Sequence, residues 1–198
     1  MLSEMTKVNF DPSLTVYPMP VCLVGAEVRG RPNFMAVAWF SKVNYSPPMM
    51  MVALGKRQYT AEGIKENGAF SVNLPGEELV AETDYCGTVS GRDEDKSRLF
   101  DVFYGEFGKA PMIRECPVCF ELELVETIEL PRTLLFIGRI VAAYADEEQV
   151  NDDRIDIPGT RQFTLIESPS SLYLSLGGRV AEAYSVGKSL SKRASPAS

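Results

Sequence analysis

The sequence contains no histidine among its 198 residues. A Ser-His-Asp or Cys-His hydrolase needs an imidazole to accept the proton of its nucleophile, so both are excluded in their usual form. Histidine ligation of a haem iron is excluded for the same reason. Proton transfer near neutral pH would therefore have to use a carboxylate, a cysteine, a lysine, a tyrosine or a bound cofactor.

Cysteine is scarce, and its spacing does not form a metal site. The chain has Cys22, Cys86, Cys116 and Cys119, and only the last two form a C-x-x-C pair. Structural zinc needs four soft ligands, and no second pair or histidine supplies them. The residues after Cys119 alternate like a strand, whereas a redox C-x-x-C needs a helix N-terminus to lower its thiol pKa. We expect no metal, and Cys119 buried in a strand that begins near Pro117.

Long apolar runs and an excess of positive charge are also missing. No run approaches the roughly 20 apolar residues that span a bilayer, and Met1–Phe10 lacks the apolar centre of a secretory signal. The net charge of −7 and pI of about 4.8 argue against nucleic acid or an anionic membrane as partner. A cytoplasmic protein is the default expectation.

The length and composition fit one globular domain. Of the residues, 45% are hydrophobic and 24% charged, which allows a core without disulfides or metal. We expect residues 1–188 to form this domain. Residues 189–198, rich in Ser, Lys, Ala and Pro without apolar periodicity, are expected to be a disordered tail.

The hydrophobic pattern is mainly β. Alternating or short apolar runs predict strands at Val21–Val24, Asn33–Phe40, Met49–Leu54, Phe70–Leu74, Phe120–Glu129 and Leu134–Ala145, with a bulge at Gly138. Short helices are expected at Thr60–Asn67, with Thr60 as hydroxyl cap, and at Gly76–Thr83, Asp95–Phe103 and Gly178–Val186. Many short strands between Gly and Pro turns indicate a closed or nearly closed antiparallel barrel.

The first candidate site segment is Asn33–Ser41. Ala36 and Ala38 alternate with large residues, so on a strand they share one face and leave room for a flat ligand. Asn33 offers a donor and an acceptor, and the single tryptophan, Trp39, can flank an aromatic ligand. Taken alone, the segment also fits a barrel strand with a core tryptophan.

Two further segments carry charge beside free backbone groups. Gly55–Thr60 places Lys56 and Arg57 where a buried strand passes into a helix, a setting that attracts phosphate, although a solvated turn stays open. The stretch Asp84–Lys96 holds two glycines, a cysteine that no core pattern needs (Cys86), and Lys96 as a further cation for a phosphate or beside the ring. Alone, it also fits a surface loop with a solvated Asp95–Lys96 pair. Together the three segments point to a flavin ring and phosphate.

The order and spacing of these segments also resemble a known family. Asn33–Ser41, Ser46-Pro47-Pro48, Gly55–Thr60, Asn73-Leu74-Pro75 and Asp84–Lys96 are similar to the flavin reductase-like FMN-binding split barrels, and among them the flavoredoxins. The resemblance runs from about Pro18 to Gly187. It implies an antiparallel split β-barrel with a few short peripheral helices, non-covalent FMN, and a homodimer with the flavin near the subunit interface.

The resemblance also implies roles for residues. Asn33 and Trp39 would contact the flavin, and Thr60 its phosphate. Thr133 stands where the family often has a histidine; its hydroxyl can bond the cofactor but cannot act as an imidazole. Ala38 replaces a hydroxyl residue and so removes one hydrogen bond. The full predicted cofactor set is Asn33, Ala36, Val37, Ala38, Trp39, Lys56, Arg57, Thr60, Cys86, Lys96 and Thr133.

The implied function is redox chemistry carried by the flavin, with no catalytic side chain. Two versions are open: an NAD(P)H-linked flavin reductase, reduced by NADH or NADPH, and a flavoredoxin-type electron carrier with a redox protein partner. No G-x-G-x-x-G fingerprint is present to bind the nicotinamide, which keeps the carrier open. Further alternatives are a non-redox ligand-binding split barrel and a binder of coenzyme F420 or haem.

Overall fold

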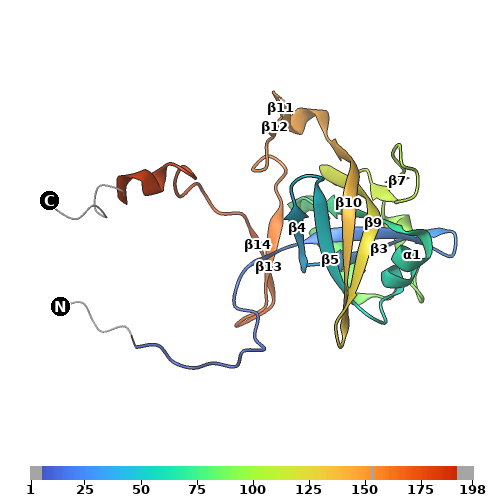
Figure 1. Cartoon of the computed structure of the whole chain (residues 1–198), viewed down its shortest axis with the longest axis horizontal. Helices are drawn as coiled ribbons and strands as arrows, with labels where there is room; N and C mark the ends of the chain where they lie inside the picture. The colour runs from blue at the N-terminus through green and yellow to red at the C-terminus, as the bar shows by residue number, and fades with distance from the viewer. Residues whose placement is uncertain (1–5, 153, 191–198) are drawn as a thin grey trace.

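The computed structural model describes residues 6–152 and 154–190, and its body is a seven-stranded antiparallel sheet (Figure 1). The strand order is β3-β2-β6-β9-β10-β5-β4. The bounds are β2 (Cys22–Val28), β3 (Arg31–Val37), β4 (Phe40–Asn44), β5 (Met49–Gly55), β6 (Ala69–Leu74), β9 (Val118–Glu129) and β10 (Thr133–Ala145). Within the described residues, β3 and β4 are the two edges and do not pair with each other. The sheet therefore stays open along this seam, and the expected antiparallel split barrel is confirmed.

Smaller elements surround this sheet. Three short sheets are formed by β1 (Met19–Pro20) with β13 (Phe163–Ile166) and β14 (Leu172–Ser175), by β7 (Val102–Phe103) with β8 (Met112–Ile113), and by β11 (Val150–Asn151) with β12 (Arg154–Ile155). The α-helices are α1 (Tyr59–Asn67) and α2 (Val80–Thr88). The 3₁₀ turns are η1 (Glu77–Leu79), η2 (Lys96–Leu99), η3 (Glu147–Gln149) and η4 (Val186–Leu190).

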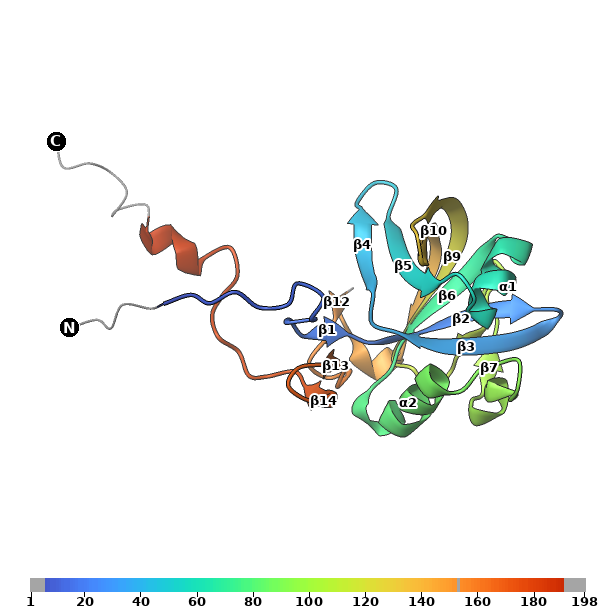
Figure 2. The same ribbon diagram turned by 90° about the horizontal axis from the view of Figure 1, so that it is seen from below.

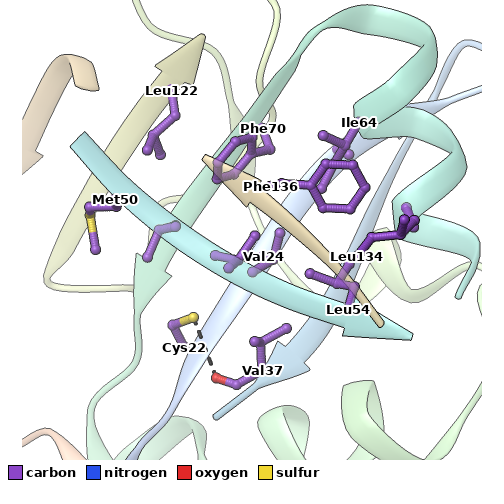
Figure 3. Close-up of a cluster of buried hydrophobic side chains, with 14 residues drawn as sticks. Cys22, Val24, Val37, Met50, Leu54, Ile64, Phe70, Leu122, Leu134 and Phe136 are labelled. Carbon is purple, nitrogen blue, oxygen red and sulfur yellow. Dashed lines mark hydrogen bonds between the residues drawn. The ribbon is translucent and has the colours of Figure 1, made fainter. Parts of the chain in front are cut away.

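The barrel core follows from the two-residue period of the strands. On β5, Met50, Val52 and Leu54 point inward, and β10 places Leu134 opposite Leu54 and Phe136 opposite Val52. Figure 3 shows Leu54, Leu134 and Phe136 on the side of Ile64 of α1. It also shows the Cys22 thiol, which donates to the carbonyl of Val37 at 3.4 Å. The register of β10 against β9 shifts at Gly138, so the expected bulge is confirmed.

A second core lies on the other face of β2 and β3. In Figure 2 these two strands run between α1 and α2, so both of their faces are covered. This cluster contains Leu23, Phe34, Met112, Cys86 and Cys119 among others. The expectation that Cys86 belongs to no core is therefore wrong: α2 buries it to 1% exposure. Cys119 is buried in β9, which begins at Val118, as expected.

Helix α1 starts differently from the expectation. Gln58, not Thr60, is the N-cap, and it makes no side-chain capping bond. Thr60 is the second helical residue, and its hydroxyl is buried against β3. The helix ends as expected at Asn67, because Gly68 adopts the left-handed conformation with φ of 62°.

Other helix boundaries need correction. The helix expected at Gly76–Thr83 is a 3₁₀ turn followed by α2, which continues to Thr88. The helix expected at Asp95–Phe103 is wrong beyond η2, because Val102–Phe103 pairs with β8 and packs on the second core. The helix expected at Gly178–Val186 is wrong, since Val180 and Tyr184 stay exposed and the segment is irregular up to η4. Of the tail expected at 189–198, residues 191–198 lie outside the described residues.

Both ends of the described chain leave the body on the same side (Figures 1 and 2). We call residues 6–18 the N-terminal arm and residues 176–190 the C-terminal arm. Val180 and Tyr184 in the C-terminal arm are each 99% exposed. Among the described residues, no helix has both the length and the apolar character needed to cross a membrane.

Candidate functional site

An apolar groove opens beside the seam between β3 and β4. Its volume is about 370 Å³, within the range of small-ligand sites. It is lined by Tyr17, Met19, Pro20, Ala38, Trp39, Phe40, Met51, Ala53, Leu130, Thr133 and Leu135. The outward residues of β5 and β10 form its floor, because the alternate residues of both strands point into the barrel core.

Trp39 stands in this groove and not in the core. It lies between the ends of β3 and β4, is 53% exposed, and its carbonyl accepts a hydrogen bond from the Ala53 amide at 2.8 Å. The small side chains of Ala38 and Ala53 keep the space beside the indole free. The alternative of a core tryptophan is therefore wrong. This wall suits a flat aromatic ligand.

The groove offers almost no acid–base chemistry of its own. Tyr17 is the only lining side chain that ionises, and Thr133 contributes a hydroxyl. Such a surface can bind and orient an apolar ring and exclude water from it. Any proton or electron transfer there would have to come from what is bound.

A basic turn continues the groove. Gly55 faces Thr133 across the β5–β10 ladder, and the Lys56 amide donates to the Arg132 carbonyl at 3.2 Å. The turn opens into a cleft lined by Gly55, Lys56, Arg57, Gln58, Pro131 and Arg132. The groove and this cleft thus meet at the Thr133–Gly55 pair.

The cations of the turn differ in availability. The Lys56 ammonium bonds the Glu129 carboxylate and holds the pKa of Glu129 below its usual range. Within the part of the chain that the structure describes, neither the Arg57 nor the Arg132 guanidinium makes an ion pair. Because Gln58 gives no capping bond, the first amides of α1 also lack a side-chain acceptor and attract an anion.

A third group of predicted residues surrounds a small buried space. Asn33 Nδ2 donates to Thr60 Oγ1 at 2.7 Å, and the two residues are 4% and 1% exposed. Residues 89–95, which we call the covering loop, lie over them. The two cavities here measure about 20 and 70 Å³. Cavities of this size have room for one or a few waters, and neither admits a flavin ring.

Lys96 is neither a solvated partner of Asp95 nor a free cation. It is 4% exposed, and its ammonium donates to the carbonyls of Cys86 at 3.0 Å and Val89 at 2.9 Å. It therefore caps the C-terminus of α2, where a cation is favoured, while burial lowers the pKa of Lys96. Burial also raises the pKa of the Cys86 thiol to about 11, so this thiol is neutral at pH 7 and a poor nucleophile.

The predicted residues therefore fall into three neighbouring places. Ala38, Trp39 and Thr133 line the groove, Lys56 and Arg57 form the basic turn, and Asn33, Thr60, Cys86 and Lys96 surround the space under the covering loop. Gln58 lines both the turn and that space, so the last two places adjoin. Ala36 packs on the second core and the Val37 side chain lies in the barrel core, which leaves Val37 only its backbone for a ligand.

Sequence reasoning missed several lining residues. Met51, Ala53 and Leu135 lie in the predicted strands Met49–Leu54 and Leu134–Ala145 but were not named as site residues. Their signal was present: residues of both alternating faces are apolar, which predicts that the outer face is covered too. Arg132 could not be found from the sequence, since a single cation next to a proline is common in hairpin turns that bind nothing.

Comparisons with known proteins identify the family of this chain. The flavin reductase like domain matches residues 14–162. A flavoredoxin structure from Methanosarcina acetivorans has a TM-score of 0.91 and 46% identity, covering 94% of this chain and 100% of that chain. The flavoredoxin of Desulfovibrio vulgaris (Miyazaki F) has a TM-score of 0.83 and 36% identity, covering 92% of this chain and 100% of that chain.

Curated relatives are more distant. An uncharacterised protein of Aeropyrum pernix is 32% identical over 136 residues, 67% of this chain, and the chain spans only 52% of that relative's length. The NADH-dependent flavin reductase StyB of Pseudomonas fluorescens is 27% identical over 141 residues, which are 70% of this chain and 78% of StyB. With the domain match over residues 14–162, these similarities show that the chain belongs to the flavin reductase-like family.

Proposed function

We propose that this protein binds FMN non-covalently, with the ring in the apolar groove and the phosphate at the basic turn. One observation carries the proposal: the groove and the turn meet at the Thr133–Gly55 pair. An apolar surface for a flat ring and a site for an anion are therefore contiguous. A flavin mononucleotide has the same two parts, a flat ring and one phosphate, joined by a short chain.

The residues present fit this cofactor. Bound FMN supplies hydride and electron transfer. Ala38 and Ala53 leave room for the ring, Trp39 flanks it, and the Thr133 hydroxyl is available to a ring polar atom. The groove needs no general acid or base of its own, in keeping with a chain without histidine.

Two activities follow from this binding, an NAD(P)H-linked flavin reductase and a flavoredoxin-type carrier that exchanges electrons with a protein partner. The similarity to StyB supports the first, and the similarity to two flavoredoxins supports the second. Anaerobic NADH and NADPH oxidation distinguishes them. A reductase turns over repeatedly and faster as free FMN is added. A carrier is reduced once and then passes its electrons to a redox protein. A chain whose flavin neither reagent reduces would fit the non-redox binding barrel.

The phosphate assignment has its own test. FMN should bind at least about tenfold more tightly than riboflavin, because only FMN offers an anion to Arg57, Arg132 and the start of α1. Arg57→Glu should remove most of this preference by placing like charges together. Arg154→Glu, at an exposed position on β12, is the matched control. An unchanged preference in Arg57→Glu would place the phosphate elsewhere.

We also propose that the protein is a homodimer. The support is exposed apolar surface that the chain does not cover itself: Val8 and Val180 on the arms, and Val43 and Leu130 near the groove. Soluble monomers bury such surface where they can. In a twofold dimer each copy covers the same surface of the other.

A further inference from the structure

The covering loop is fastened to α1 by one side chain, Arg92. Its Nη1 donates to the Arg57 carbonyl at 3.2 Å, and its Nη2 bonds the Glu62 carboxylate. The guanidinium carbon also lies 5.0 Å from the centre of the Tyr59 ring. Three different interactions therefore join the tip of the loop to the basic turn and to the first turns of the helix.

The loop is held closely over Asn33. A Cβ on Gly91 would collide with Asn33 Oδ1 and with the Tyr59 ring, so only glycine lets the backbone approach this far. At its far end the loop is closed by Lys96, which bonds the carbonyls of Cys86 and Val89. Lys96 keeps the two ends of the loop together, whereas Arg92 holds its tip against α1.

In this closed arrangement Asn33 and Thr60 cannot touch a cofactor. The Asn33 amide donates to the Thr60 hydroxyl, and the cavities around the two residues have room only for water. Gln58 lines both the basic turn and this space, so a phosphate beside Arg57 can also reach Thr60 only when the covering loop moves away from α1. The contacts that have to break are those of Arg92, because Lys96 bonds only within its own segment.

We propose that Arg92 is a positioning residue that holds the covering loop closed over Asn33 and Thr60 and thereby sets the rate at which FMN enters and leaves. This inference rests on the proposed function. It bears directly on the choice between the two activities, because a flavin that exchanges slowly suits a resident electron carrier and one that exchanges rapidly suits a reductase that releases flavin.

The loop itself is tested without flavin, by amide hydrogen exchange. Tyr59 and Thr60 at the start of α1 are buried beneath the loop, so the exchange of their amides reports its movement away from the helix. Arg92→Ala should raise their exchange rates about tenfold, the expected loss of a partly exposed ion pair, a hydrogen bond and a cation–π contact. Arg29→Ala is the control, because Arg29 also approaches Glu62, at 3.9 Å, but does not touch the loop. Unchanged exchange in Arg92→Ala would overturn the proposal.

Flavin exchange is then measured by stopped-flow fluorescence. Arg92→Ala should raise both the association and the dissociation rate of FMN about tenfold, with an affinity changed less than about threefold. A simple loss of folded structure would not accelerate association. Arg92→Lys keeps the charge opposite Glu62 but loses the planar guanidinium. Its association and dissociation rates should therefore lie between those of wild type and Arg92→Ala.

The two proposals fail in different ways. A folded wild-type protein that takes up no FMN would overturn the proposed function, and with it the gating of FMN, while flavin-free exchange would still show whether Arg92 closes the loop. FMN binding by the wild type with rates unchanged in Arg92→Ala would leave the proposed function standing and overturn the role of Arg92.

Discussion

Lys96 illustrates how burial changes the task of a charged side chain. Its ammonium is removed from water and faces two backbone carbonyls, with no carboxylate partner among the described residues. The carbonyls at the end of α2 carry partial negative charge, which offsets part of the cost of burying the cation. A residue that looks like a phosphate ligand in the sequence therefore acts on the fold, by closing a loop.

This account predicts the effect of Lys96→Met. The variant keeps the length and apolar stem of the side chain but leaves two carbonyls without their donor, so the free energy of unfolding should fall by about 1–3 kcal/mol. Lys65→Met, at an exposed position in the last turn of α1, should change it by less than about 0.5 kcal/mol. Urea denaturation measures both. An equally stable Lys96→Met would mean that desolvation cancels the capping bonds.

The buried thiols predict a pH dependence. Burial raises the pKa of Cys86 to about 11 and that of Cys119 to about 12, from the usual value of 9.0. The folded protein thus keeps protons that the unfolded chain releases. The stability that these thiols contribute is fully present below about pH 9 and is lost as pH rises through 11 and 12.

Unfolding measured in urea between pH 8 and 11 checks this prediction. Wild type should lose more stability over this range than a Cys86→Ala, Cys119→Ala variant, in which neither group titrates. If both proteins lost the same stability over this pH range, the raised pKa values of Cys86 and Cys119 would be contradicted. As a second check, a thiol reagent at pH 8 should modify none of the four cysteines until urea is added, since all four are buried.

At the scale of elements, α1 depends on close contact with β2. A Cβ on Gly63 would collide with the Glu27 carbonyl and meet the Val28 side chain at 2.7 Å. Glycine inside a helix normally costs about 1 kcal/mol relative to alanine. Here it is required, because the backbones of helix and strand approach too closely for any side chain.

Gly63→Ala should therefore destabilise the protein, although it raises helix propensity. We expect a loss of about 1–3 kcal/mol from overpacking. Lys65→Ala, two residues further along and exposed, is the matched control and should be neutral within about 0.5 kcal/mol. Thermal or urea unfolding measures both. A gain in stability from Gly63→Ala would show that α1 can move away from β2.

Elements with a strong period were predictable, and those defined by tertiary contacts were not. The six predicted strands lie in or overlap the barrel, because each has an inward apolar face that burial selects. β1, β13 and β14 were not predicted, since a strand of two to four residues is too short to show a clear alternation of apolar and polar residues. The helix expected at Gly178–Val186 was wrong for a different reason, because within the described part of the chain Val180 and Tyr184 are each 99% exposed and no packing stabilises a helix there.

The candidate site, too, was only partly predictable from the sequence. The basic turn and the groove residue Trp39 could be found from residue type and order. The burial of Cys86 and Lys96 could not, because it depends on α2 folding back over β3. Nothing in the sequence connects Arg92 with Glu62 and Tyr59, which lie far earlier in the chain, before the covering loop is in place.

For the whole molecule, the arms predict the oligomeric state. Light scattering should give wild type a mass of twice the 21.9 kDa chain. Val180→Asp with Tyr184→Asp should weaken the dimer, because two fully exposed apolar side chains are replaced by charges. Ala181→Asp with Ala183→Asp adds the same charges to the same arm without removing large apolar side chains and should do so less. A monomeric wild type at micromolar concentration would contradict the homodimer.

The central claim is that FMN lies with its ring in the apolar groove and its phosphate at the basic turn. The most direct measurement is a crystal structure of the protein with excess FMN. We predict the isoalloxazine against Ala38, Ala53 and Thr133, the phosphate beside Arg57 and the first turn of α1, and the covering loop moved or reclosed around it. A structure in which that groove holds no flavin, or is filled by the protein's own apolar side chains, would contradict the account.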